Sequence, residues 1–96
     1  MVCVRRIQGI VQEIIRTDEF KEDEDGNKWY KCIFIVKLDR FSKRTPNEEL
    51  PARLKNEKVR IVRWCCFDWH YKTGIRITLT PNETKAVLEG RLDLTR

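Results

Sequence analysis

A chain of 96 residues, of which 36% are charged and 41% are apolar, fits one small domain and excludes the large catalytic scaffolds. A domain of this length buries about 60 to 65% of the surface that its unfolded chain exposes, so any site is expected near the surface. The 20 Lys and Arg outnumber the 15 Asp and Glu, and the resulting net charge of +5 favours acidic partners.

The lengths of the apolar runs predict in which cellular compartment the protein lies, and the compartment predicts whether its cysteines are reduced or form disulfides. Arg5 and Arg6 precede only short apolar runs, unlike the apolar core of a signal peptide. The uncharged run at residues 32–36 has five residues, whereas a membrane span needs about 20. We therefore expect a soluble, cytoplasmic protein with no membrane partner.

The four cysteines are Cys3, Cys32, Cys65 and Cys66, and in a cytoplasmic protein they are expected to stay reduced. There is no Cys-x-x-Cys motif and His70 is the only histidine, so the ligand spacing of a zinc site is absent. Cys65 and Cys66 are expected to point to opposite faces of a strand, without redox chemistry. We expect no metal and no cofactor.

Acidic residues are concentrated in one segment. Residues 18–27 hold six acidic residues and one lysine, so the rest of the chain carries a net charge of +10. Three roles stay open for the acidic loop between Asp18 and Asp25: a solvated turn, a docking element for a basic protein surface, or a weak cation site. Residues 23–27 lack the full spacing of a calcium loop and its closing glutamate.

The first half of the chain predicts two strands. Residues 2–17 are rich in Val and Ile, and Gly9 predicts a bend or bulge in this strand. Residues 18–28 are expected to form the turn. The second strand, residues 29–39, alternates strictly. One face carries Tyr30, Cys32, Phe34, Val36 and Leu38, which we assign to the core, and the other carries Trp29, Lys31, Ile33, Ile35 and Lys37.

The second half predicts two further strands after a polar connection over residues 40–56. The strand at residues 58–66 places Val59 and Ile61 inward, and the strand at residues 75–80 alternates in the same way. Their outward positions hold Lys58, Arg60, Trp64, Arg76 and Thr78.

The C-terminal segment changes from strand to helix periodicity. Residues 80–83, Thr-Pro-Asn-Glu, form a capping box with proline at the first helical position, and they predict a helix over about residues 81–90. Gly90 is expected to end or weaken it. The alternative is a hairpin in which residues 85–94 return against the fourth strand.

The predicted layout resembles the OB-fold, the small Greek-key barrel of many single-stranded nucleic-acid-binding proteins. The resemblance covers roughly residues 4–80. It is carried by the opening strand Ile7-Gln8-Gly9-Ile10-Val11, by residues 29–39, by the turn and strand at residues 54–62, and by residues 75–79. The chain departs from the family between Asp39 and Glu57, where a third strand and a helix are missing. The resemblance implies a small antiparallel β-barrel. With the helix predicted from the capping box, we expect a mainly β chain that forms one OB-like domain over residues 1–96 with a short C-terminal helix. An SH3-like or other small barrel is the alternative.

Basic and aromatic side chains share the predicted outward face. Cations contact phosphates, and flat rings stack on bases with about 1 to 3 kcal/mol per base, so this combination is typical of single-strand binding. The predicted nucleic-acid-binding residues are Trp29, Lys31, Lys37, Lys58, Arg60, Trp64, Trp69, Tyr71, Lys72 and Arg76. The alternative is a solvated face whose cations only keep the protein in solution.

Three rings occupy alternate positions in one short segment, at Phe67, Trp69 and Tyr71, and Lys72 follows them. The OB-fold resemblance implies that this segment is a loop that grips the ligand. Two other roles stay open. The rings pack against the C-terminal helix, or they bury themselves in a protein partner or a homodimer.

Catalytic constellations are absent from the sequence. His70 is the only histidine and Ser42 the only serine, so no nucleophile, base and orienting acid can be assembled, and we expect no enzyme. The predicted function is binding of nucleic acid, DNA or RNA, with single strands preferred. The alternative is a protein-interaction module or inhibitor that docks through its acidic loop and aromatic hairpin.

Overall fold

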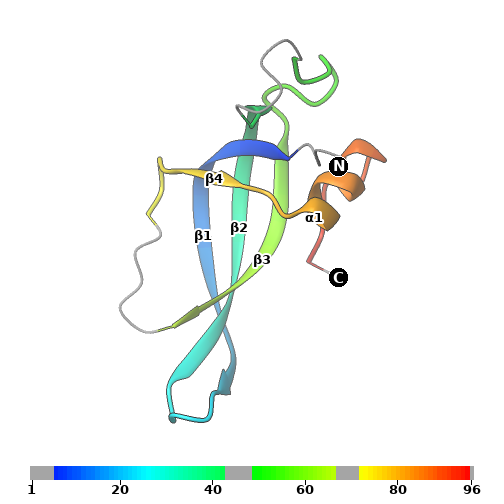
Figure 1. Ribbon diagram of the computed structural model, residues 1–96. Coiled ribbons are helices and arrows are strands. Elements are labelled where there is room, and N and C mark those ends of the chain that lie inside the picture. Colours follow the sequence, from blue (N-terminus) through cyan, green and yellow to red (C-terminus); the bar gives the residue numbers. More distant parts are fainter. Residues whose placement is uncertain (1–5, 43–48, 67–71, 96) are drawn as a thin grey trace.

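The computed structural model describes residues 6–42, 49–66 and 72–95 of the chain. In these residues the chain forms one antiparallel sheet of four strands and one short helix (Figure 1). The elements are β1 (Ile7–Glu22), β2 (Lys28–Phe41), β3 (Lys58–Cys66), β4 (Arg76–Thr78) and α1 (Pro81–Leu88). The strand order is β3-β2-β1-β4, so the first two strands occupy the centre of the sheet. The chain is therefore mainly β with a short C-terminal helix, as predicted.

The core lies on one face of the sheet. The alternation predicted for β2 is confirmed, since Cys32, Phe34, Val36 and Leu38 are buried and Tyr30 is half-buried. Val11 of β1 and Ile61 of β3 contribute to the same cluster, as do Leu79 and Val87 from beyond the sheet. The connection between β2 and β3, predicted to be polar, also buries two leucines, Leu50 and Leu54.

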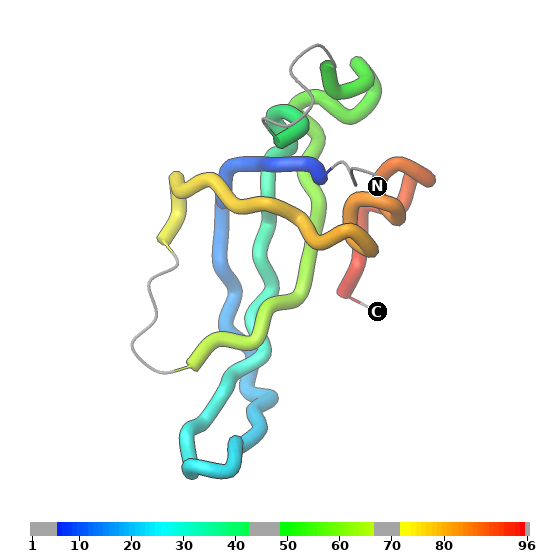
Figure 2. The backbone as a smooth tube through the Cα atoms, viewed as in Figure 1, coloured from blue at the N-terminus to red at the C-terminus, as the bar shows by residue number. Residues whose placement is uncertain are grey.

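β1 bends near its start, as Gly9 predicts. The pairing with β2 shifts by one residue between Gln8 and Gly9, and the backbone turns sharply in the first residues of β1 (Figure 2). A Cβ atom on Gly9 would lie 2.5 Å from Val36 Cγ1 and 2.6 Å from the Lys37 carbonyl oxygen. Only glycine lets the two backbones approach so closely at the bend.

The predicted end of the first strand at residue 17 is wrong. β1 continues through the acidic segment to Glu22, and the turn is limited to residues 23–27. Pairing with β2 resumes after a bulge between Arg16 and Phe20, where the Phe20 and Tyr30 ring centroids lie 5.7 Å apart. Cross-strand contacts therefore outweigh the low strand propensity of acidic residues. The predicted acidic loop is instead the end of a long hairpin that projects from the sheet (Figure 1).

The turn is closed by the side chain of Asp23. Its carboxylate accepts hydrogen bonds from the backbone N–H groups of Asp25 and Asn27, both at 2.9 Å. Gly26 has φ +81°, a left-handed conformation that glycine adopts without strain.

The capping box predicted for the helix is confirmed. The Thr80 side chain accepts from the Glu83 N–H, and the Glu83 carboxylate accepts from the Thr80 N–H at 2.8 Å. The helix ends at Leu88, two residues before the end predicted, and Gly90 follows with φ +96°. On the sheet side, the Ile7 N–H donates to Thr84 Oγ1 at 3.2 Å, which attaches α1 to β1.

The predicted closed barrel is not formed by the described residues. The fourth strand, predicted over residues 75–80, is limited to the three residues of β4, because the capping box then directs the chain into α1. After α1 the tail reaches the edge of β3, where the Arg60 N–H donates to the Leu92 carbonyl and the Leu94 N–H donates to the Arg60 carbonyl. This single bridge, Arg60 to Asp93, is parallel. The alternative of a return hairpin against β4 is therefore wrong, because the tail pairs with β3.

Candidate nucleic-acid interface

One face of the sheet is turned away from the core, and we call it the outer face. The register between β2 and β3 places Lys31 opposite Trp64, Ile35 opposite Arg60 and Lys37 opposite Lys58. The outer face of these two strands consists of Trp29, Lys31, Ile33, Ile35 and Lys37 on β2, and Lys58, Arg60, Val62, Trp64 and Cys66 on β3. Six of the predicted site residues therefore share one face, as their alternation implied.

Three cations form a basic cluster on this face: Lys37, Lys58 and Arg60. Lys37 and Lys58 are directly opposite each other on adjacent strands, which brings their Cβ atoms to within about 5.5 Å. Arg60 is the next residue after Lys58 on the outer face of β3. Lys58 and Arg60 are exposed and Lys37 is half-buried. Within the described residues no carboxylate pairs with any of the three, so their charges face solvent.

Two other predicted cations are already paired. Arg76 lies opposite Ile10, which in turn lies opposite Lys37, so it extends the same row across the sheet. However, its guanidinium forms an ion pair with Asp39. Lys31 forms an ion pair with Glu19 across 3.7 Å. Both carboxylates reduce the positive charge available to a ligand.

Trp29 and Trp64 meet at the hairpin end of the outer face, in a hollow of about 360 Å³ that we call the tryptophan hollow. The Lys21 ammonium lies 4.4 Å from the centre of the Trp64 ring, a cation–π contact. The Trp29 indole N–H donates to Asp23 Oδ2 at 3.0 Å. The remaining residue of the lining is Glu22. Lys21 was not identified as a site residue from the sequence, because the pattern of residues 18–28 predicts a turn and not a strand.

The hydrogen bonds at the turn change the acidity of Asp23. The Trp29 indole N–H makes the largest contribution, followed by the Asn27 backbone N–H, and together they hold the pKa of Asp23 below its ordinary value of 3.8. The carboxylate therefore stays charged beside the tryptophan hollow and fixes the edge of Trp29.

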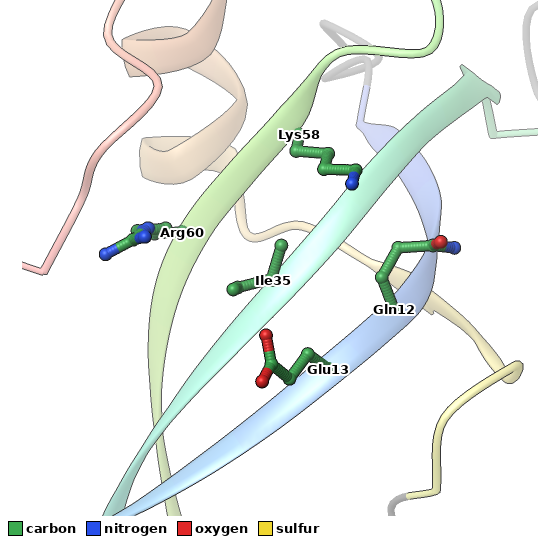
Figure 3. A pocket seen from close by; sticks show the side chains of 5 residues that line it. All are labelled: Gln12, Glu13, Ile35, Lys58 and Arg60. Carbon is green, nitrogen blue, oxygen red and sulfur yellow. The ribbon is translucent and has the colours of Figure 1, made fainter.

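A second hollow, of about 650 Å³, lies over the centre of the outer face (Figure 3). We call it the bulge hollow, and its lining is Gln12, Glu13, Ile35, Lys58 and Arg60. Gln12 and Glu13 were also missed from the sequence. The available signal was the pair of successive polar residues inside a Val- and Ile-rich strand.

The remaining predicted residues stand apart from this cluster. Trp69 and Tyr71, together with Phe67 and His70, lie outside the described residues. Lys72 is exposed in the connection that leads to β4.

A second aromatic group lies on the core-side face of the hairpin, around Tyr30. The Arg16 guanidinium carbon is 3.9 Å from the centre of the Tyr30 ring, and the Lys28 ammonium is 5.1 Å from the centre of the Phe20 ring. Phe20 remains 48% exposed. The hairpin therefore presents rings and cations on both faces.

The cysteines of the described ranges are free thiols. Cys65 is buried and Cys66 is half-buried, as expected for neighbours on opposite faces of a strand. Burial raises the pKa of Cys65 to about 12, and the neighbouring Cys32 thiol adds to the effect. Such a thiol is a poor nucleophile at neutral pH.

No group of three His, Cys, Asp or Glu side chains in the described ranges is arranged to hold a metal ion. Among these residues there is also no helix of the length and apolarity needed to cross a membrane.

Comparisons of this chain with protein-family models, with curated proteins and with solved structures found no match.

Proposed function

We propose that the outer face binds single-stranded nucleic acid. The observation that carries this proposal is the basic cluster, in which Lys37, Lys58 and Arg60 come from two neighbouring strands and have no carboxylate partner among the described residues. Clustered cations without partners attract the phosphates of a nucleic-acid backbone and release its counterions.

The tryptophan hollow supplies the second requirement, a surface for stacking. Trp29 and Lys37 are eight residues apart on β2, which corresponds to about 27 Å at roughly 3.4 Å per residue. A strand bound along β2 would therefore place phosphates at the basic cluster and a base at the tryptophan hollow. Lys21, which now covers the Trp64 ring, would give way to the base and move to a phosphate.

An OB-like fold is part of this proposal. OB-folds are partly open barrels that bind oligonucleotides on the face of their second and third strands. Two observations support the likeness. The strand β3, which carries Lys58 and Arg60, pairs with β2 and so takes the place of the third strand that the resemblance left missing. The tail after α1 adds a parallel bridge at the edge of β3. The position of α1 after β4 is the main departure from the resemblance seen in the sequence.

The first test is a titration of tryptophan fluorescence with a 12-nucleotide single strand, of DNA and of RNA, with a duplex of equal length as the control. We expect quenching by single strands. Neutralisation of three phosphates by the basic cluster predicts a slope of about −2 for log K against log salt concentration, at roughly −0.7 per phosphate. No quenching at low salt contradicts the proposal.

The second test locates the face. The double variant Lys58→Glu/Arg60→Glu should weaken single-strand binding more than tenfold and reduce the salt slope. The matched control Lys85→Glu/Arg91→Glu makes the same change of charge on α1 and the tail, where both side chains are exposed. Equal losses in the two variants would show that net charge, and not the outer face, governs binding.

Docking to a basic protein surface is the second candidate function. It is favoured by Phe20, which is 48% exposed on a hairpin end whose carboxylates are exposed. Under this alternative, Glu22→Lys/Glu24→Lys abolishes binding of a basic partner and leaves nucleic-acid affinity unchanged or higher. A homodimer through the same hairpin predicts a dimeric mass in sedimentation equilibrium that becomes monomeric in the Phe20→Ser variant.

A further inference from the structure

The bulge hollow owes its shape to an irregularity in β1. Val11 pairs with Val36 on the core face and Glu13 pairs with Ile35 on the outer face, so Gln12 is an extra residue between them. Such a bulge re-aims side chains, and here it leaves Gln12 and Glu13 lining one hollow (Figure 3). The Glu13 carboxylate points toward Ile35, whereas the Gln12 carboxamide points to the other side of β1 (Figure 3).

The side chains of Gln12 and Glu13 form few polar contacts with the described part of the protein. In the described part of the chain the Glu13 side chain has neither a hydrogen bond nor an ion pair, although two cations line the same hollow. The Gln12 amide reaches only its own strand, with Nε2 at 3.5 Å from the Ile10 carbonyl oxygen, a long contact. Both side chains are exposed, so Glu13 can bind a ligand without losing a protein partner and Gln12 would give up only this long contact.

The lining has a polarity that matches one nucleotide. The Glu13 carboxylate, an acceptor, and the Gln12 amide, which can donate and accept, come from β1, and the apolar side chain of Ile35 comes from β2. The cations come from β3, with the Lys58 ammonium extending over β2 and the Arg60 guanidinium pointing away from Ile35 (Figure 3). A nucleotide has a hydrogen-bonding base edge at one end, an apolar base face in the middle and an anionic phosphate at the other end. A base packed flat on Ile35 would present its edge to β1 and its phosphate to β3.

We infer that the bulge hollow binds one base of the strand and selects guanine, an inference that rests on the proposed function. The Watson–Crick edge of guanine presents, in order, one acceptor and two donors. The carboxylate of Glu13 matches the two adjacent donors, N1–H and N2–H, in a bidentate contact. The Gln12 side chain points away from Glu13 and would have to rotate toward the base before its amide N–H could donate to the acceptor O6.

The other bases fit the Glu13 carboxylate less well. Thymine and uracil offer a single donor between two acceptors, so one carbonyl oxygen would face the Glu13 carboxylate. Adenine and cytosine each offer one donor beside an unprotonated ring nitrogen, which a carboxylate repels. The selectivity therefore depends on the negative charge and the two oxygens of Glu13. The same charge repels phosphates and so lowers the affinity of the basic face for every strand.

The experiment compares 12-nucleotide thymine strands that carry one central guanine, inosine, adenine, cytosine or thymine, by anisotropy of a terminal fluorophore. With the unmodified protein we expect the guanine strand to bind about tenfold more tightly than the all-thymine strand. Inosine lacks the N2 amino group, so it should lose most of that gain without any change to the protein.

The variant Glu13→Gln separates base selection from general affinity. It should bind the all-thymine strand somewhat more tightly, because one negative charge is gone, while the preference for guanine falls below about twofold. Glu24→Gln at the hairpin turn makes the same change of charge and should keep the preference.

Three results would overturn the inference and leave the proposed function intact: equal binding of guanine and thymine strands, equal binding of guanine and inosine, or a preference that survives in Glu13→Gln. Tighter binding of the adenine or cytosine strand would also refute it. If no strand binds, the proposed function itself fails, and the inference fails with it.

Discussion

The ion pair between Arg63 of β3 and Glu83 of α1 offers the sharpest test of how the helix is held. The Arg63 guanidinium contacts both carboxylate oxygens, with Nη2 at 2.7 Å from Oε1, and the two side chains are only 21% and 15% exposed. The same carboxylate also accepts from the Thr80 N–H as part of the capping box. Removal of the guanidinium would leave a largely buried carboxylate with one weak partner.

We expect Arg63→Met to lower the free energy of unfolding by about 3 kcal/mol, at the lower end of the range for breaking a buried pair, because both side chains keep some contact with water. That is a large part of the roughly 5 to 10 kcal/mol available to a domain of this size. Glu83→Gln should cost less, about 1 to 2 kcal/mol, since the carboxamide oxygen still accepts from Thr80 and the arginine can reach solvent. The double variant should cost less than the sum of the two, by at least about 1 kcal/mol.

The assay is urea unfolding at pH 7 and at pH 3, followed by far-ultraviolet circular dichroism. Burial alone would raise the pKa of Glu83, but the hydrogen bonds from Arg63 and Thr80 outweigh it and hold the pKa below its ordinary value of 4.5. A lowered pKa stabilises the fold above pH 4.5, and this stabilisation is lost as the pH falls through the lowered value. The difference between the parent protein and Arg63→Met should therefore shrink at pH 3.

The matched control is Arg91→Met, which removes an exposed arginine from the tail and should change stability by less than about 0.5 kcal/mol. A loss below 1 kcal/mol in Arg63→Met, or an equal loss at the two pH values, would refute the view that this ion pair holds α1 against β3.

Three further predictions concern the bend, the turn and the core. Gly9→Ala should lower the free energy of unfolding in urea by about 3 kcal/mol or more, because its Cβ would lie 2.6 Å from a backbone oxygen. Gly26→Ala, with φ +81° and open space around it, should lower it by about 1 to 2 kcal/mol. The reverse order would contradict the close approach at the bend. Trp29→Phe should raise the pKa of Asp23 toward 3.8, as followed by carboxyl-carbon nuclear magnetic resonance, and an unchanged pKa would exclude the indole hydrogen bond. Cys65 should react with iodoacetamide at pH 8 about a hundredfold more slowly in the folded protein than in urea. Raising its pKa from 9.0 to about 12 lowers the thiolate fraction about a thousandfold, and the higher nucleophilicity of the more basic thiolate offsets part of this loss; peptide mapping that finds equal rates would contradict its burial.

Local patterns were sufficient for most of the elements. The period of two in β2 identified its core face from Cys32 to Leu38, because the side chains of a strand must alternate between two environments of opposite polarity. The capping box identified the start of α1, because the Thr80 and Glu83 side chains satisfy backbone groups only a few residues away. Gly9 identified the bend in the same local way, because a residue without a Cβ atom lets a neighbouring backbone approach closely.

The candidate site was predictable only in part. The basic cluster followed from alternation along single strands, and the register between β2 and β3 then brought its members together. Lys21 and the pairing of Lys31 with Glu19 could not be predicted, because they depend on β1 continuing beyond residue 17 to meet β2 again. The bulge that exposes Gln12 and Glu13 likewise depends on two paired strands, because a residue is extra only relative to the register of the neighbouring strand.

By itself, the sequence determined the number and order of the strands in the described residues, which of their faces are apolar, where the helix begins and that the body is basic. Each of these properties depends on interactions within a few residues or on composition. The tertiary structure alone decided that the sheet stays open in the described residues, that the tail returns to β3, and which cations have a carboxylate partner. These features arise from contacts between residues distant in sequence, such as Arg76 with Asp39, whose formation depends on register and on competition among carboxylates that no local pattern encodes.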